Sequence, residues 1–124
     1  MSFGAAIKSV LSQYVGFTGR ARRSEYWWFA LFTVLVSIAA AILDSVLGLT
    51  FVEGSTSGVI GLIASLLLLL PTLAVAVRRL HDTDRTGWWV LIGLVPLVGA
   101  IVLIVFFVQD GTPGANRFGP SPKG

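Results

Sequence analysis

The side chains of this chain that could do chemistry gather in one short stretch. Within eight positions it carries three arginines, one histidine and two aspartates: Arg78, Arg79, His81, Asp82, Asp84 and Arg85. An imidazole beside carboxylates can contact a divalent cation, and an imidazole can also act as a general base. However, the arginines compete for the carboxylates, and no Ser/His/Asp or Cys/His arrangement supplies a nucleophile. We therefore predict no catalytic residue and no enzymatic activity.

Metal and cofactor chemistry is not expected either. The chain has one histidine and no cysteine, which argues against a zinc site and against thiol chemistry. Its glycines match neither the GxGxxG spacing nor a phosphate-binding loop with a lysine. We predict no metal ligand and no cofactor.

A second charged group lies upstream, at Arg20, Arg22, Arg23 and Glu25. Three interpretations of the two groups remain open. They can form a structural network of ion pairs, bind anionic headgroups or phosphate, or support chemistry with His81 as the base. The structural network is favoured, because such networks also bring ionisable groups together.

The composition is that of a membrane protein. Of the 124 residues, 55% are hydrophobic and 12% are charged, whereas an ordinary soluble domain has about a quarter of its residues charged. The net charge is +3, and the basic residues lie beside apolar runs. That placement favours anionic lipid headgroups as partners and excludes nucleic acid.

Three apolar segments predict an all-α protein with a single membrane domain, 1–124. The predicted spans are 26–48, 59–77 and 88–108, and a helix needs about 20 apolar residues to cross a bilayer. A cleaved signal peptide is the alternative for the first segment. Its uncharged run of 18 residues is longer than a signal core, so a retained anchor is preferred.

The N-terminal segment, 1–16, has the pattern of a short amphipathic helix. Phe3, Ile7, Val10 and Tyr14 recur at helical spacing on one face, and Gly16 offers a stop. Such a helix can lie in the cytoplasmic headgroup layer or pack on the rest of the protein. Both alternatives are open.

The distribution of basic residues predicts the orientation. One arginine group precedes the first predicted span, and the other lies between the second and third spans, so both fall on the same side of the membrane as the N-terminus. The connection 49–58, between the first and second spans, carries only Glu53 as a charged residue. By the positive-inside rule, the N-terminus and the Arg78–Arg85 stretch are cytoplasmic and the 49–58 connection is outside.

Pro96 divides the third apolar segment into two halves. The side of the membrane on which the tail, 109–124, lies depends on how the chain continues after this proline. A proline kink in a continuous span is the simpler explanation and puts the tail outside. A re-entrant hairpin would instead return the tail, with Arg117 and Lys123, to the cytoplasm. If they share a side, Asp110, Asn116 and Arg117 can cap or pair with the Arg78–Arg85 stretch.

Aromatic and polar residues mark the ends of the spans. We expect Ser24 to cap the first span and Asp44 to lie ionised near its outer boundary. Aromatic residues directly follow each of the two charged groups in the sequence. They predict an interfacial aromatic belt formed by Tyr26, Trp27, Trp28, Trp88 and Trp89.

Three blocks of sequence carry a family resemblance: Gly19–Trp28, Arg78–Trp89 and Gly111–Pro120. In this order and spacing they resemble the small bacterial inner-membrane proteins typified by YhaH and YhaI, termed domain of unknown function eight hundred and five. The resemblance implies an integral, multi-pass protein of the bacterial inner membrane without an established activity. It supplies no catalytic residues.

We therefore expect a structural or accessory membrane component. The alternatives are a lipid-handling enzyme or an anionic-lipid-binding protein that uses the cytoplasmic Arg78–Arg85 stretch, and a subunit of an oligomeric transporter. A protein partner or a homo-oligomer stays open.

Overall fold

The computed structural model describes residues 2–52 and 57–122. Glu53 and Lys123, which entered the argument about orientation, lie outside these ranges. Within them the chain forms five helices and no β-strand, which confirms the all-helical prediction. Two of the helices are long and apolar enough to cross a membrane.

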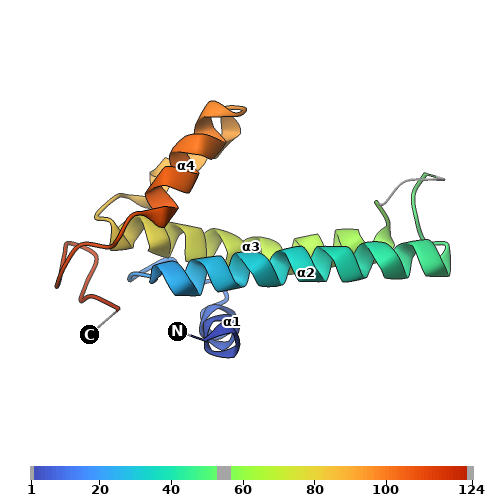
Figure 1. Cartoon of the computed structure of the whole chain (residues 1–124), viewed down its shortest axis with the longest axis horizontal. Coiled ribbons are helices and arrows are strands. Elements are labelled where there is room, and N and C mark those ends of the chain that lie inside the picture. Colours follow the sequence, from blue (N-terminus) through green and yellow to red (C-terminus); the bar gives the residue numbers. More distant parts are fainter. Residues whose placement is uncertain (1, 53–56, 123–124) are drawn as a thin grey trace.

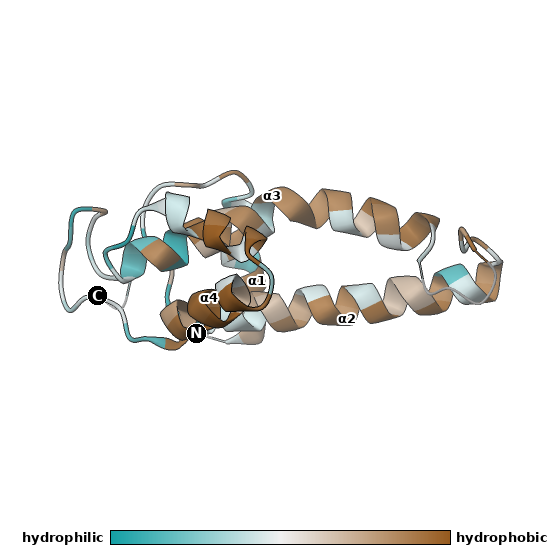
Figure 2. Cartoon of the chain, turned by 90° about the horizontal axis from the view of Figure 1, so that it is seen from above, coloured by the Kyte–Doolittle hydropathy of each residue, from teal (hydrophilic) through white to brown (hydrophobic). Residues whose placement is uncertain are grey.

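These two are α2, Arg23–Leu47, and α3, Val59–Asp82, which lie side by side (Figure 1). At 1.5 Å per residue each is about 37 Å long, enough for a bilayer core. Figure 2 shows that apolar residues cover most of their length, whereas hydrophilic residues gather near the start of α2 and the end of α3. Their leucines and isoleucines are largely exposed, as expected for a surface that faces lipid.

The ends of these helices differ from the predicted bounds. α2 begins at Arg23 with Arg22 in the capping position, so Ser24 lies inside the first turn and the predicted Ser24 cap is wrong. α3 continues beyond residue 77 to Asp82. Its last turn stays helical because the arginines there find buried partners, described below.

α1, Phe3–Ser12, packs across the long helices and is seen nearly end-on in Figure 1. Val10 on its apolar face is buried against Phe29 of α2 and Val75 of α3. A further contact comes from Tyr14, whose hydroxyl donates a hydrogen bond to the carbonyl of Leu67. Pro71, inside α3, has no N–H for that carbonyl, so the tyrosine satisfies a group that the proline leaves free.

The third apolar segment is not a continuous helix. It forms the 3-10 helix η1, Gly87–Leu94, and the α-helix α4, Val98–Val108, which fold back on each other. Across this hairpin the rings of Trp89 and Phe106 lie 5.5 Å apart. The single kinked span at 88–108 is therefore wrong, and the chain reverses direction after Pro96 (Figure 1).

Two backbone features make this reversal possible. Leu97 adopts a positive φ of 64°, which breaks the helical path between η1 and α4. Gly99 lies against η1 so closely that an added Cβ would come within 1.7 Å of the carbonyl oxygen of Ile92. Only glycine permits this approach.

Asp44 joins the two long helices at the end away from the charged residues. Its side chain is fully buried, and its two carboxylate oxygens accept hydrogen bonds from the N–H groups of Ile60 (2.9 Å) and Gly61 (3.0 Å). An acid of α2 thus caps the N-terminus of α3, where the helix dipole favours an anion. The sequence placed Asp44 near the outer end of the first span but did not predict its burial or its partners in α3.

We predict that Asp44→Ala lowers the free energy of unfolding by about 1–3 kcal/mol, because two N–H groups of α3 lose their acceptor. The measurement is thermal unfolding of the purified protein in mild detergent. Ser45→Ala, at the exposed neighbouring position, is the matched control and should melt like the parent. Equal melting of both variants would contradict the capping role.

Candidate functional site

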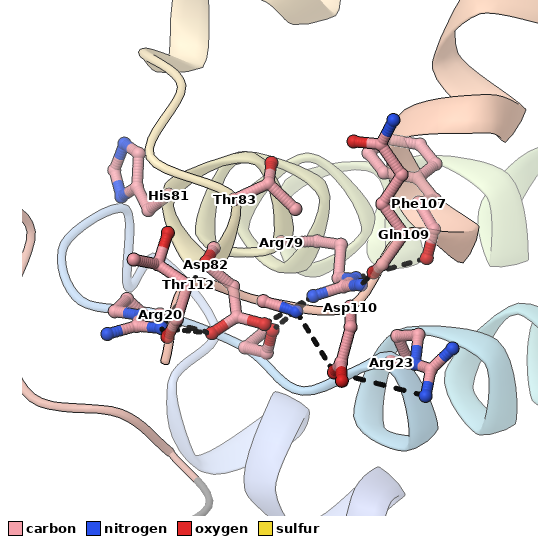
Figure 3. Close-up of polar contacts among 12 residues, drawn as sticks. Arg20, Arg23, Arg79, His81, Asp82, Thr83, Phe107, Gln109, Asp110 and Thr112 are labelled. Carbon is pink, nitrogen blue, oxygen red and sulfur yellow. Dashed lines mark hydrogen bonds and ion pairs between the residues drawn. The ribbon is translucent and has the colours of Figure 1, made fainter. Parts of the chain in front are cut away.

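The charged residues meet at one end of the molecule, here called the charged end. It comprises the segment from Gly16 to the first turn of α2, the last turn of α3, the end of α4 and the tail as far as Gly119. Figure 3 shows Asp82 at its centre, between the guanidiniums of Arg20 and Arg79. Arg20 binds one carboxylate oxygen of Asp82 at 3.0 Å, and Arg79 binds the other. All three side chains are at least 98% buried.

Most of the other hydrogen bonds of both arginines go to backbone carbonyls at the end of α4 and in the tail. Arg20 donates to the carbonyls of Thr112 and Gly114, each at 2.6 Å. Arg79 donates to those of Phe107, at 3.1 Å, and Gln109. These bonds attach the end of α4 and the tail to α3 and to the segment that precedes α2.

A second buried ion pair lies beside the first. Arg78 donates to a carboxylate oxygen of Glu25 at 2.6 Å and to the carbonyl of Gly16 at 3.0 Å. The carbonyl of Arg78 accepts from the N–H of Ala21 at 2.9 Å. Glu25 therefore connects the first turn of α2 to the end of α3.

His81 has a structural environment. Its Nδ1 lies 2.8 Å from the carbonyl of Gly19, and because a carbonyl only accepts, Nδ1 carries the proton. The imidazole stacks on Phe118 with ring centroids 4.0 Å apart and planes 2° from parallel. Across the described parts of the chain, no group of three or more His, Asp or Glu side chains could hold a metal ion.

The other charged residues lie nearer the surface. Asp84 pairs with Arg117 at 3.2 Å, and Arg85 lies over the ring of Phe106, 3.9 Å from its centroid. Arg23 donates to the carbonyl of Val108 at 3.2 Å and lies 3.9 Å from Asp110. The sequence-predicted cluster thus divides into a buried group and a more accessible group, in which Arg23 and Asp84 are exposed and Arg85 is half-buried. Arg22 is intermediate in exposure.

The predicted aromatic residues have different environments. Tyr26 packs against Phe107, with ring centroids 4.3 Å apart, and the indole N–H of Trp27 donates to the carbonyl of Phe107 at 3.2 Å. Trp28 contacts α1 through Phe3. Trp88 is 78% exposed, and Trp89 packs on α4 through Phe106.

Sequence reasoning missed the backbone acceptors of the tail. The expected contacts of Asn116 and Arg117 with the Arg78–Arg85 stretch are confirmed: Asn116 donates to the carbonyl of His81 at 3.0 Å, and Arg117 pairs with Asp84. The carbonyls that bind Arg20 and Arg79 carry no side-chain signal. The Gly/Pro-rich composition of 111–120 was the available indication, because a non-helical segment leaves its carbonyls free for other donors.

We predict that Asp82→Asn lowers the stability by about 3–5 kcal/mol, because it leaves two buried guanidiniums without their carboxylate. Thermal unfolding in mild detergent measures the effect. Asp84→Asn removes the same charge from an exposed pair and should cost less than about 1 kcal/mol.

His81→Ala separates structure from chemistry at the same end. It should destabilise the protein less than Asp82→Asn, since it loses one hydrogen bond and one ring contact. A His81→Ala protein that folds and melts normally but fails to rescue a deletion phenotype would instead support a catalytic histidine.

Comparison with known proteins gives a consistent family. Residues 14–120 match the model described as protein of unknown function (DUF805). The inner membrane protein YhaH of Escherichia coli K12 is 50% identical over 92% of this chain and 93% of its own length. The inner membrane protein YhaI of the same strain is 47% identical over 93% and 92%. The uncharacterized protein YiiR is 34% identical over 83% of each chain. No solved structure matches. With this coverage and identity, the chain belongs to the DUF805 family.

Proposed function

We propose that this chain is a multi-pass protein of the bacterial inner membrane, with a structural or accessory role rather than an enzymatic one. The observation that carries the proposal is the buried network around Asp82, in which each ion-pairing charged group has partners within the protein. Breaking such a network would leave buried charges unpaired, so these residues hold the end of the molecule in one arrangement. Anionic lipids of the cytoplasmic leaflet are its expected neighbours.

The environment of His81 supports a structural role over catalysis. A general base needs a free nitrogen within reach of a substrate proton. Here Nδ1 donates its proton to the carbonyl of Gly19, so Nε2 is the nitrogen that could act as a base, but one ring face stacks on Phe118 and the residue is largely buried, which limits the access of a substrate. A lipid-handling enzyme that uses His81, Asp82 and Asp84 is the weaker alternative, because Asp82 and Asp84 both bind arginines.

We also propose that the charged end faces the cytoplasm and that η1 and α4 form a re-entrant hairpin. α4 has 11 residues, about 17 Å of helix, which is too short for a bilayer core of about 30 Å. The hairpin is entirely apolar, so it suits insertion to partial depth. Its return brings the tail back to the charged end, where the arginines lie.

Single cysteines in this naturally cysteine-free chain test the topology. In intact cells, an impermeant thiol reagent should label Val52→Cys, in the connection between α2 and α3. Thr83→Cys and Ala115→Cys should react only after permeabilisation, because both lie at the charged end. Labelling yield by gel shift is the readout.

Two results would contradict this arrangement. Labelling of Thr83→Cys but not Val52→Cys in intact cells would reverse the orientation. Labelling of both Val52→Cys and Ala115→Cys from outside would place the tail across the membrane and exclude the re-entrant hairpin.

A further inference from the structure

A surface groove runs from the first turn of α2 along the outside of that helix. Its upper part, meaning the part nearest the charged end, is a hollow of about 350 Å³ lined by Arg23, Ser24, Trp27 and Val108. A second hollow of about 220 Å³ shares Ser24 and Trp27 and continues past Trp28 to Leu31. The two hollows are shallow and share Ser24 and Trp27, so they lie next to each other on the surface; together they are here called the α2 groove.

The upper end of the α2 groove is polar and positively charged. The side chain of Arg23 is 48% exposed and is held in place by the carbonyl of Val108. Asp110, 3.9 Å from Arg23, is 64% exposed and neutralises part of this charge. The adjoining Arg22 adds a further cation. The groove therefore begins beside an excess of positive charge.

Polar groups without a protein partner lie at the same end. Among the described residues, three side-chain atoms are buried and make no hydrogen bond: Arg22 Nε and Ser24 Oγ at the start of α2, and Arg78 Nη2 beside Glu25. The start of α2 also lacks a side-chain cap, although the first N–H groups of a helix need acceptors. Buried donors in folded proteins normally have a partner, so their arrangement fits an absent ligand that supplies oxygen acceptors.

The lower end of the groove is apolar. The Trp27 ring is fixed by its hydrogen bond to the carbonyl of Phe107 and forms one wall. Leu31 follows, and the exposed Leu35 and Ile38 continue the apolar surface along α2. A ligand of this groove must combine an anionic head with an apolar body.

We propose that the α2 groove binds one anionic phospholipid. Arg23 and the Ser24 hydroxyl hold the phosphate, with Arg22 beside it, and an acyl chain lies along Trp27, Trp28 and Leu31. Arginine and hydroxyl donors bind phosphate oxygens through charge-assisted hydrogen bonds. Tryptophan is suited to the level of the headgroups. The inference rests on the proposed membrane location, and it moves lipid binding away from the Arg78–Arg85 stretch, whose first two arginines are buried in ion pairs.

Native mass spectrometry of the full chain, released from mild detergent with added dioleoyl phosphatidylglycerol, tests the site. Phosphatidylglycerol should bind more tightly than dioleoyl phosphatidylcholine. Arg23→Gln should weaken phosphatidylglycerol binding about fivefold, as expected for one cation near an anionic headgroup. Arg85→Gln, an equal change of charge at a surface arginine that does not line the groove, should leave the affinity unchanged.

The Ser24→Ala variant tests the site with a substitution that should not disturb the fold. Ser24 Oγ has no protein partner in the described chain, so the variant should melt like the parent yet bind phosphatidylglycerol about two- to tenfold more weakly. An unchanged affinity for Ser24→Ala would overturn the proposal. Equal losses in Arg23→Gln and Arg85→Gln would indicate diffuse surface charge and would also overturn it.

Two further arms identify the ligand and separate this inference from the proposed function. Equal binding of the two lipids would exclude selection for an anionic headgroup. Displacement of phosphatidylglycerol by millimolar inorganic phosphate would mark a free-phosphate site instead of a lipid site. The binding measurement does not depend on orientation, so a reversed labelling pattern would refute the topology while leaving this result in place.

Discussion

Asp82 lies between two buried guanidiniums, and the arrangement of the charged end depends on this contact. One carboxylate cannot neutralise both Arg20 and Arg79, so one positive charge remains in excess. A buried charge is costly unless it is hydrogen-bonded. Here the tail supplies the missing acceptors, since its carbonyls at Phe107 and Thr112 bind the remaining arginine N–H groups. The path of the tail therefore follows from an imbalance of charge inside the bundle.

The two long helices are joined most firmly at their ends. At one end Glu25 binds Arg78, and at the other Asp44 caps α3. Toward the Asp44 end, the helices and their connection border an open hollow of about 370 Å³, lined partly by hydroxyl-bearing and small residues, among them Ser37 and Ser65. Lipid chains are as apolar as leucine, so in a bilayer no hydrophobic force closes such a gap. Polar contacts at the ends therefore add to the apolar packing of Phe29 and Val75 in holding the helices together.

The parts of the fold that follow from local pattern could be predicted, whereas the parts that follow from distant partners could not. Runs of apolar residues were sufficient to predict α2 and α3, and the charge pattern identified the residues of the ion-pair cluster. The partner of Asp44 lies in another helix, and backbone acceptors carry no residue type. Pro96 indicated an interruption, but the direction of the chain after it depends on the contact of Gly99 with η1.

The dependence of Arg20 and Arg79 on carbonyls from 107–114 has a consequence for biogenesis. A ribosome delivers α2 and α3 to the membrane before it has synthesised these acceptors. Until then, both guanidiniums have only Asp82 and the Ala21 carbonyl as partners within the completed part of the chain. The helical hairpin can insert during translation, but the charged end can reach its final packing only after the tail emerges. Completion of this fold is therefore a late, post-insertion step.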